Sequence, residues 1–395
     1  MFTTHLFDRS YGRIYQNLGR LLMKKTVYDC TDLRCLCGYL NGTYDTSCVL
    51  PNGNILARAV RREYRMLSEQ QRERYHNAMN VIKRNGVYDD LARLYTKCET
   101  SPGAHAGPAF LPWHRVFLTR LEIALRVVDP TVSLPYWDTT LEFALHHPND
   151  SILWTKELMG KEDNDGYVYE SPFMNWKTLD GRSTFMRRVG RKGQLIRESD
   201  IAVILNSSLE EQMLAYTAAT MECSKLGYWT AIEYLHEKPH LYVGGDMEHF
   251  TKATNDPLFW NLHAMIDLLW ERWRKKNQNE AERQTQYPND DKRCSGEEHF
   301  AHSPMIPFTG LQNIDGLSNK YTDNLYVYSE RPKCSEERPE GCNSKYLFCD
   351  FSNGEPHCAS KIRIGGFCGG YTKGEKPCYQ GVCNERKFCV KEFDE

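Results

Sequence analysis

The chain has 395 residues, of which 41% are hydrophobic, enough to bury a sizeable core in one large domain or two to three average ones. Its 50 basic and 52 acidic residues nearly cancel, and a net charge of −2 provides no basic surface for nucleic acid. No apolar run reaches the roughly 20 residues that cross a bilayer. The sequence therefore predicts neither a nucleic-acid partner nor a membrane partner.

The cysteines are unevenly distributed: of 15 in total, the last eight fall within residues 334–389. That density is typical of a disulfide scaffold and predicts an oxidising compartment outside the cytosol. Three glycosylation triplets, at Asn41, Asn149 and Asn206, agree with secretion. Zinc binding is the alternative, but the eight cysteines do not form C-x2-C pairs. The odd total leaves at least one cysteine unpaired, and the sequence leaves the pairing open.

The chain begins with a turn-rich segment, residues 1–59, that has little apolar periodicity. Its first 20 residues contain no apolar stretch of the kind found in signal peptides. We therefore expect a secreted precursor to begin upstream of Met1.

Helical patterns start after residue 60. Residues 67–86 predict a helix that begins at the capping residue Ser68 and ends at Gly86. The sequence YDDLARLY (88–95) predicts a second, short helix. Residues 101–112, SPGAHAGPAFLP, contain too many glycines and prolines for regular structure, and predict a loop.

Two longer helices show strong apolar stripes. The first is predicted from Trp113 to Val128, has His114 on its core face, and ends before Pro130. The second follows Pro257 and has His263 on its core stripe. The apolar periodicity ends near residue 330. We predict a mainly helical core over residues 60–330, followed by a cysteine-rich tail over 331–395.

Five of the 13 histidines fall into two groups along the chain: His105 and His114, then His236, His240 and His263. Imidazole suits both Cu(I) and Cu(II), and a coupled copper pair needs about six such ligands. Each histidine has an ordinary alternative as a hydrogen-bonded core residue. Pro239 lies between two members of the second group and predicts a helix break there. We therefore expect His236 and His240 to come from a loop or helix end.

The residues around these histidines carry a family resemblance. GAHAGPAFLPWHRVFLTRLEIALR (103–126) with SLPYWD (133–138) closely resembles the first copper segment of tyrosinase-like proteins. HEKPHLYVGGDM (236–247) with NDPLFWNLHAMIDLLWERW (255–273) resembles the second, and Tyr326-Val327-Tyr328 resembles the Tyr-x-Tyr element that closes the family's domain. The resemblance covers residues 60–330. It implies the type 3 copper fold of tyrosinases, catechol oxidases and haemocyanins, a mainly α four-helix bundle whose two copper ions bind dioxygen.

The resemblance also implies a role for each matching residue. The second and third ligands of the first copper would be His105 and His114, and the second copper would be bound by His236, His240 and His263. Phe259 would pack beside the histidines of the second copper, and Asp267 would support the helix that carries His263.

The chain departs from the family pattern at the first ligand of the first copper, where Tyr95 occupies the expected position. His76 is the only nearby histidine, and we expect it to serve in packing or at the surface. A phenol, with a pKa of roughly 10, is a poor ligand at neutral pH, although a metal lowers such values. Two interpretations follow: this site binds copper weakly or abnormally, or activity has been lost while the fold remains.

Three smaller departures lie nearby. Gly103 stands where some relatives have a thioether-forming cysteine, and Leu262 where many have a histidine. Glu237 occupies a position where many tyrosinases have asparagine or glycine. Its carboxylate could act as a base toward a monophenol, or could be an ordinary exposed glutamate.

The tail adds a second resemblance, because residues 342–368 are similar to the cysteine-rich tails of tyrosinase-like proteins from mollusc mantle and shell. This implies secretion into an extracellular matrix. The leading hypothesis is a tyrosinase- or catechol-oxidase-like enzyme that uses dioxygen to oxidise phenols or catechols to o-quinones, for cross-linking or pigmentation. Its substrates would be phenolic small molecules or tyrosine side chains of matrix proteins. The alternative is a catalytically degenerate fold acting as a non-enzymatic shell-matrix protein; oxygen transport is disfavoured, because such carriers are usually multi-unit chains.

Overall fold

The computed structural model describes residues 26–218, 222–225 and 229–392, and divides the chain into two compact units, 1–57 and 58–395. The described part of the first unit contains helix α2 (Leu33–Tyr39) and the antiparallel strands β1 (Thr43–Tyr44) and β2 (Cys48–Val49). Disulfides Cys30–Cys35 and Cys37–Cys48 cross-link this small unit.

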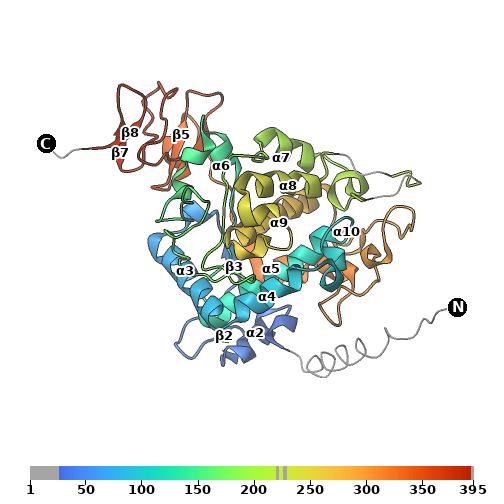
Figure 1. The fold of residues 1–395 in the computed structure, drawn as a ribbon. Coiled ribbons are helices and arrows are strands. Elements are labelled where there is room, and N and C mark those ends of the chain that lie inside the picture. The colour runs from blue at the N-terminus through green and yellow to red at the C-terminus, as the bar shows by residue number, and fades with distance from the viewer. Residues whose placement is uncertain (1–25, 219–221, 226–228, 393–395) are drawn as a thin grey trace. The chain divides into compact units, whose positions relative to one another are not determined.

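The second unit is built mainly from helices (Figure 1). Its α-helices are α3 (Glu69–Arg84), α4 (Val87–Tyr95), α5 (Phe110–Val128), α6 (Thr140–Phe143), α7 (Glu198–Leu205), α8 (Ile232–Val243), α9 (Leu258–Asn277) and α10 (Glu282–Thr285). Helix α5 packs against α3 and α9, and α9 also packs against α8. The predicted mainly helical core is confirmed.

Local signals explain where the first helices begin and end. Ser68 caps α3 through a reciprocal capping box with Gln71, as predicted. Gly86 adopts φ +87° between α3 and α4, a conformation that glycine takes at no steric cost. Helix α5 begins at Phe110, three residues before the predicted start, so the end of the predicted loop was wrong. Pro112 is tolerated because the first turn of a helix makes no use of its missing N–H.

Helices α5 and α9 form the centre of the core. The sequence predicted one apolar stripe on each, but burial extends around nearly the whole circumference: 16 of 19 residues in α5 and 16 of 20 in α9 are buried. Charged residues on these helices are therefore paired inside the protein. Glu122 of α5, for example, accepts hydrogen bonds from the buried Arg61 guanidinium.

The prediction of a helix break at Pro239 was wrong, because α8 runs without interruption from Ile232 to Val243. Proline removes one backbone hydrogen bond from a helix interior and crowds the preceding turn. Here Pro239 is itself buried, and α8 packs against α9. Tertiary packing therefore retains the helical conformation that the local sequence disfavours.

The beginning and end of the helical region meet in a short parallel pair, β3 (Ala59–Arg61) with β4 (Tyr326–Tyr328). Beyond it lie two antiparallel hairpins, β5 (Leu347–Asp350) with β6 (His357–Ser360), and β7 (Gly381–Cys383) with β8 (Cys389–Lys391). The hairpins lie at one end of the unit, beside α6 (Figure 1). The boundaries predicted at 59/60 and 330/331 remain predictions.

All eight tail cysteines form disulfides, so none of them is available as a zinc ligand. The pairs are Cys334–Cys349, Cys342–Cys358, Cys368–Cys383 and Cys378–Cys389. A further disulfide, Cys223–Cys294, cross-links two loops of the helical region.

Among the residues that the model describes, no helix combines the length and apolar character needed to cross a bilayer.

Candidate metal centre

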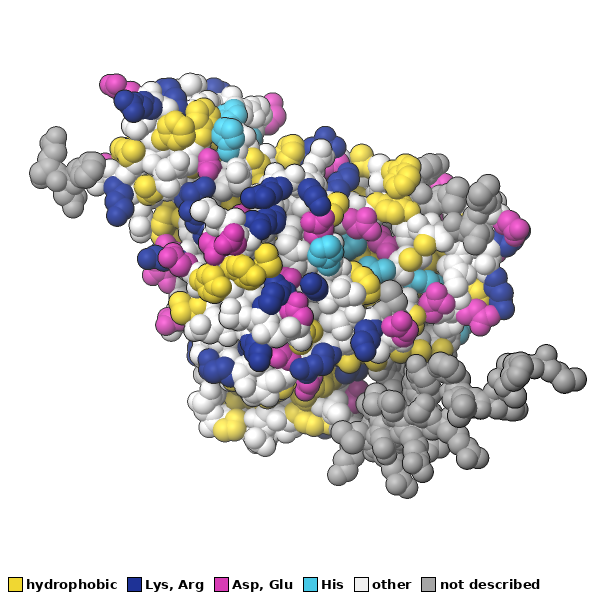
Figure 2. Space-filling model, in the orientation of Figure 1, with side chains coloured by type: hydrophobic (Ala, Val, Ile, Leu, Met, Phe, Trp, Pro, Cys, Tyr) yellow, Lys and Arg dark blue, Asp and Glu magenta, His cyan; other side chains and the backbone are white. Residues whose placement is uncertain are grey.

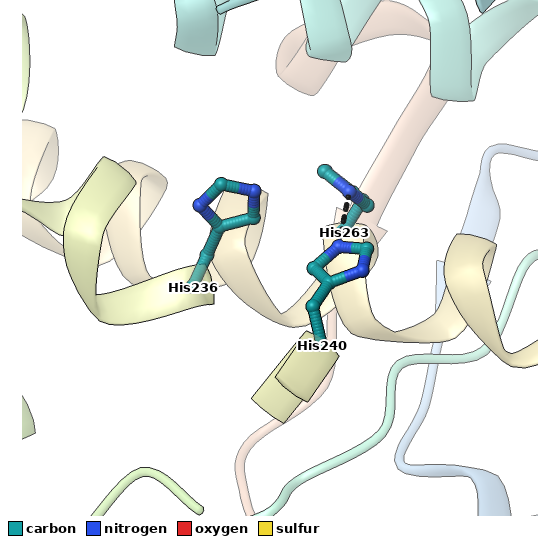
Figure 3. A group of neighbouring side chains, drawn as sticks. All are labelled: His236, His240 and His263. Carbon is teal, nitrogen blue, oxygen red and sulfur yellow. Dashed lines mark hydrogen bonds between the residues drawn. The ribbon is translucent and has the colours of Figure 1, made fainter. Parts of the chain in front are cut away.

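The five predicted histidines converge in the core. His114 projects from α5, His236 and His240 from α8, His263 from α9, and His105 from the loop before α5. The rings of His114 and His263 stack with centroids 4.3 Å apart. The ring centroid of His236 lies 5.2 Å from those of both His240 and His263. Figure 3 shows His236 and His240 extending from one helix toward His263 on another.

Backbone carbonyl groups set the tautomer of three of these rings. The Nδ1 atom of His114 lies 2.9 Å from the carbonyl oxygen of Phe110, and that of His240 lies 2.9 Å from the carbonyl of Met247. His236 Nδ1 contacts the carbonyl of Glu233. A carbonyl only accepts, so each Nδ1 carries the proton and each Nε2 presents a lone pair.

Burial keeps the imidazoles neutral. It lowers the pKa of His105 to about 3 and that of His240 to about 4. Burial also lowers the pKa of His114, His236 and His263 well below the usual value, and the neighbouring histidines add to the effect. Neutral imidazole is the form that binds a metal ion.

Three further observations fit a metal ion. The Nε2 atoms of His240 and His263 lie 3.1 Å apart, close to the spacing of two nitrogen ligands about 2.0 Å from one ion. The three α8 and α9 histidines have donor atoms all within 4.8 Å of one another. The buried Nε2 of His114 has no hydrogen-bond partner among the residues that the structure describes, an unfavourable situation that a bound cation would relieve. An all-imidazole set suits copper.

A cavity of about 200 Å³ reaches this cluster from solvent. Its lining combines histidines with aromatic, aliphatic and acidic side chains: Tyr95, His105, His236, Glu237, His240, Leu241, Met247, Glu248 and Phe250. Figure 2 shows histidine side chains on the surface among acidic and apolar ones. Glu237 is exposed at this cavity, and partial desolvation there raises the pKa of its carboxyl group.

Comparison with known proteins places the chain in a family. Residues 74–276, just over half of the chain, match the family model for the common central domain of tyrosinase. The putative tyrosinase-like protein tyr-3 of Caenorhabditis elegans is 46% identical over 364 residues, covering 92% of this chain and 52% of that protein. A tyrosinase-like protein of Pinctada maxima is 32% identical over 327 residues, covering 78% of this chain and 68% of that protein. This chain belongs to the tyrosinase family.

One solved structure supports the fold of this tyrosinase-family chain. A polyphenol oxidase from Thermothelomyces thermophila superposes with a TM-score of 0.50 at 18% identity, over 69% of this chain and 89% of that one. The chain spans about half the length of its Caenorhabditis elegans relative. The matched tyrosinase domain contains all five histidines and Tyr95, and ends before the cysteine-rich tail.

The departure from the tyrosinase pattern lies inside the cluster. Tyr95, the last residue of α4, is 1% exposed, and its hydroxyl oxygen lies 2.8 Å from Nε2 of His105. His76 lies outside the cluster, where its Nε2 contacts the Tyr64 hydroxyl at 2.8 Å. Gly103 and Leu262 are both buried.

The two predicted supporting residues lie beside His263. The ring of Phe259 is 4.2 Å from that of His263, between centroids. Asp267, one helical turn further along α9, accepts hydrogen bonds from Arg115 at 2.7 Å and from Tyr326 at 2.7 Å. Burial alone would raise the pKa of Asp267, but Arg115 and Arg61 hold it below its usual value. This network ties α9 to α5 and to the Tyr-x-Tyr element of the tyrosinase family.

No pattern in the sequence indicated Glu233, which holds the loop that presents His105. Ala106 adopts φ +71°, a strained conformation for a residue with a side chain. Its N–H donates to the Glu233 carboxylate at 2.5 Å, and Thr217 donates to the other carboxylate oxygen. Burial raises the pKa of Glu233 to about 7, against the effect of these hydrogen bonds. The backbone carbonyl of Glu233 also contacts Nδ1 of His236, so Glu233 connects that histidine to the loop that carries His105.

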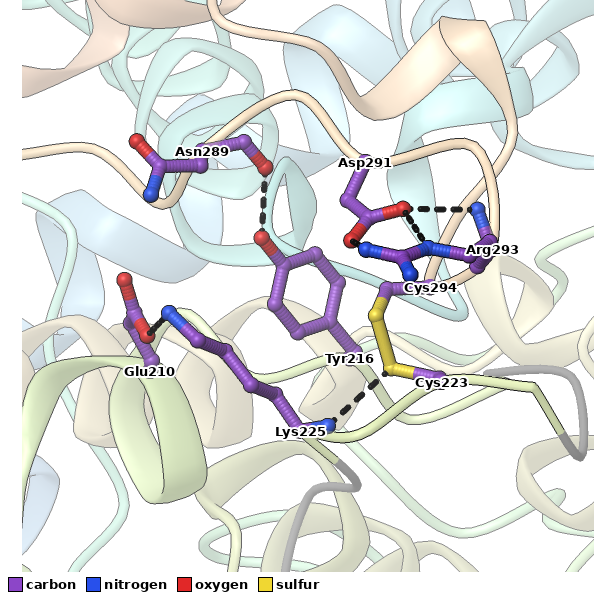
Figure 4. Close-up of a disulfide and its surroundings, with 8 residues drawn as sticks. All are labelled: Glu210, Tyr216, Cys223, Lys225, Asn289, Asp291, Arg293 and Cys294. Atoms are coloured by element: carbon purple, nitrogen blue, oxygen red, sulfur yellow. Dashed lines mark hydrogen bonds and ion pairs between the residues drawn. A yellow bond between two sulfur atoms is a disulfide. The ribbon is translucent and has the colours of Figure 1, made fainter.

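His299 was also missed, because a single histidine in an irregular segment carries no periodic signal. It is 2% exposed and packs on Gly107, two residues after His105. The Cys223–Cys294 disulfide and a 2.6 Å hydrogen bond from Tyr216 to the carbonyl of Asn289 tie its segment to the loop before α8 (Figure 4).

Proposed function

We propose that this chain is a copper-dependent oxidoreductase of the tyrosinase type that oxidises phenols or catechols to o-quinones with dioxygen. The observation that carries the proposal is the convergence of five neutral imidazoles from α5, α8, α9 and one loop, four of them buried and that of His105 partly buried. By family resemblance, His105 and His114 bind one copper, and His236, His240 and His263 bind the other. Bound copper would supply the electron transfer between the phenol and dioxygen.

The protein's own part is to hold the ligands and admit the substrate. Backbone carbonyls aim three Nε2 lone pairs inward, so little reorganisation is needed on metal binding. The cavity of about 200 Å³ is smaller than the roughly 300–1,000 Å³ pockets that take drug-sized ligands. Leu241, Met247 and Phe250 give it apolar walls. These features favour a single-ring phenol, either free or as a protein's tyrosine side chain.

The compartment we propose is the extracellular matrix. The described residues form seven disulfides, four of them in the tail, which support an oxidising environment. The o-quinones would there cross-link or pigment matrix protein.

One observation favours a second candidate, a non-enzymatic matrix protein with a degenerate centre. The Tyr95 hydroxyl contacts the nitrogen of His105 that would otherwise bind copper. If this contact closes the first site, the protein would keep the fold without turnover.

The test is to reconstitute the purified protein with copper, measure copper per chain, and follow oxygen uptake with catechol. The enzyme proposal expects two coppers and catechol-dependent uptake. His263→Ala should lose second-site copper and all oxidation, while His302→Ala, at an exposed position outside the cluster, should retain both. Copper below two per chain without oxygen uptake would favour the matrix protein.

A further inference from the structure

The Tyr95 side chain points into the candidate metal centre. Its ring lies at 5.2 Å from the ring of His105 and 5.8 Å from that of His114, edge-on to both. It stacks parallel to Phe117, with centroids 5.9 Å apart. The apolar surroundings hold the ring in one orientation, with its hydroxyl oxygen toward the histidines.

The distance between the Tyr95 oxygen and the His105 nitrogen is that expected of two ligands to one ion. Two donor atoms each about 2.0 Å from a metal, at roughly a right angle, lie about 2.8 Å apart. Tyr95 Oη and His105 Nε2 are separated by 2.8 Å. His114 supplies a third donor, because its Nδ1 is bound to a carbonyl and its buried Nε2 has no partner among the described residues. The end of α4, the loop before α5, and α5 itself thus each contribute one donor.

We propose that Tyr95 is the third ligand of the first copper ion, through its phenolate oxygen. This deepens the proposed function, on which it rests, by naming the ligand set of the same site. On binding, the O–H bond breaks, its electron pair stays on the oxygen and is shared with Cu(II), and the proton passes to solvent through the cavity that Tyr95 lines. The centre is then asymmetric, with one half of two imidazoles and a phenolate and the other of three imidazoles.

The asymmetry affects which oxidation state of copper the first site prefers. An anionic oxygen donor is harder than imidazole and stabilises the higher charge of Cu(II) relative to Cu(I). The first site therefore retains oxidised copper more tightly than the second. Replacing the phenolate by imidazole would make the two sites alike.

The experiment compares wild type with Tyr95→Phe and Tyr95→His, each loaded with Cu(II), by copper per chain, visible absorption and resonance Raman scattering. Wild type should show a phenolate-to-copper charge-transfer band, with ring vibrations that shift when the tyrosines are ring-deuterated. Tyr95→Phe should lose the band and bind one copper instead of two. Tyr95→His should bind two coppers without the band.

Tyr75→Phe is the matched control, because Tyr75 is equally buried and its hydroxyl contacts Asn261 rather than a histidine. It should keep both coppers and the band. Circular dichroism of each metal-free variant checks the fold. A Tyr95→Phe protein that keeps both coppers and the wild-type spectrum would overturn the ligand assignment, even if catechol is oxidised. A wild type that shows the band but never oxidises catechol would confirm the ligand and refute the enzyme.

Discussion

His76 lies on α3, where its Nε2 contacts the Tyr64 hydroxyl and its ring packs edge-on against Phe173, with centroids 5.2 Å apart. Burial lowers the pKa of His76 to about 3, and the charge of Arg72 adds to the shift. In the unfolded chain the pKa of this imidazole is near its ordinary value of roughly 6.5. Between these two values the folded protein binds fewer protons than the unfolded chain, so the free energy of unfolding falls as the pH is lowered through this window.

The first prediction concerns this residue. When the pH is lowered from 7.5 to 5, the unfolding free energy should fall by about 2 kcal/mol less in His76→Gln than in wild type. The reason is that the variant lacks the imidazole that the folded protein keeps neutral. Urea unfolding of the metal-free protein at both pH values measures the difference. Tyr64→Phe is the control: it removes the hydrogen bond but keeps the imidazole, so it should retain the wild-type pH dependence. Equal losses in His76→Gln and wild type would refute the prediction.

At the scale of elements, the loop before α5 is held between two segments that come later in the chain. On one side, the Glu233 carboxylate of α8 accepts the N–H of strained Ala106. On the other, the ring of His299 lies so close to Gly107 that a β-carbon there would be 2.8 Å from its Cγ atom. This loop has no thioether cysteine at position 103, so these noncovalent contacts and the Cys223–Cys294 disulfide position His105.

The second prediction tests that arrangement. Gly107→Ala should displace the loop, speed hydrogen exchange of residues 103–108 in the metal-free protein, and weaken copper retention. His299→Ala makes room for the new methyl group. In that background Gly107→Ala should therefore have a smaller effect on hydrogen exchange and copper retention than it has in wild type. Gly38→Ala is the control, since a β-carbon there has no neighbour within 4 Å. Strictly additive effects of the two substitutions would show that the His299 ring does not restrict the space at Gly107.

At the scale of the whole molecule, the cysteine-rich tail of the second unit is packed onto its helical core. Leu141 of α6 is buried with Leu347 and the Cys342–Cys358 disulfide. Tyr346 donates a hydrogen bond to Glu157 at 2.5 Å and accepts one from Arg72 at 2.6 Å. Tail and core therefore share buried surface and buried polar contacts, and we expect them to unfold together.

The third prediction follows from this shared packing. Replacing both Cys342 and Cys358 by alanine opens a cross-link between residues 16 apart and should cost about 3 kcal/mol. Because the disulfide packs on α6, the unfolding midpoint of the core, followed by tryptophan fluorescence, should fall as well. Replacing Cys30 and Cys35, in the other compact unit, is the control and should leave that midpoint unchanged. A tail that becomes protease-sensitive while the core midpoint is unchanged would contradict the prediction.

The local features of the fold could be predicted from the sequence alone. Ser68 and Gly86 set the ends of α3 through capping and left-handed backbone, which depend on residues within one turn. The apolar stripes identified α5 and α9, and the motifs around His105, His114, His236, His240 and His263 indicated the family. The replacement at Tyr95 was also visible, because the motif predicts a residue type at that position.

How these parts meet could not be predicted in this way, because it depends on contacts across the folded core. Pro239 stays helical because packing outweighs a local preference, which no window of sequence can show. The roles of Glu233 and His299, and the pairing of the cysteines, depend on contacts between residues far apart in the chain. The direction of the Tyr95 hydroxyl was likewise set by Phe117 and Phe259, which come from two different helices. Such contacts form only when the whole core is assembled, because each side chain's place depends on the volume left by all the others.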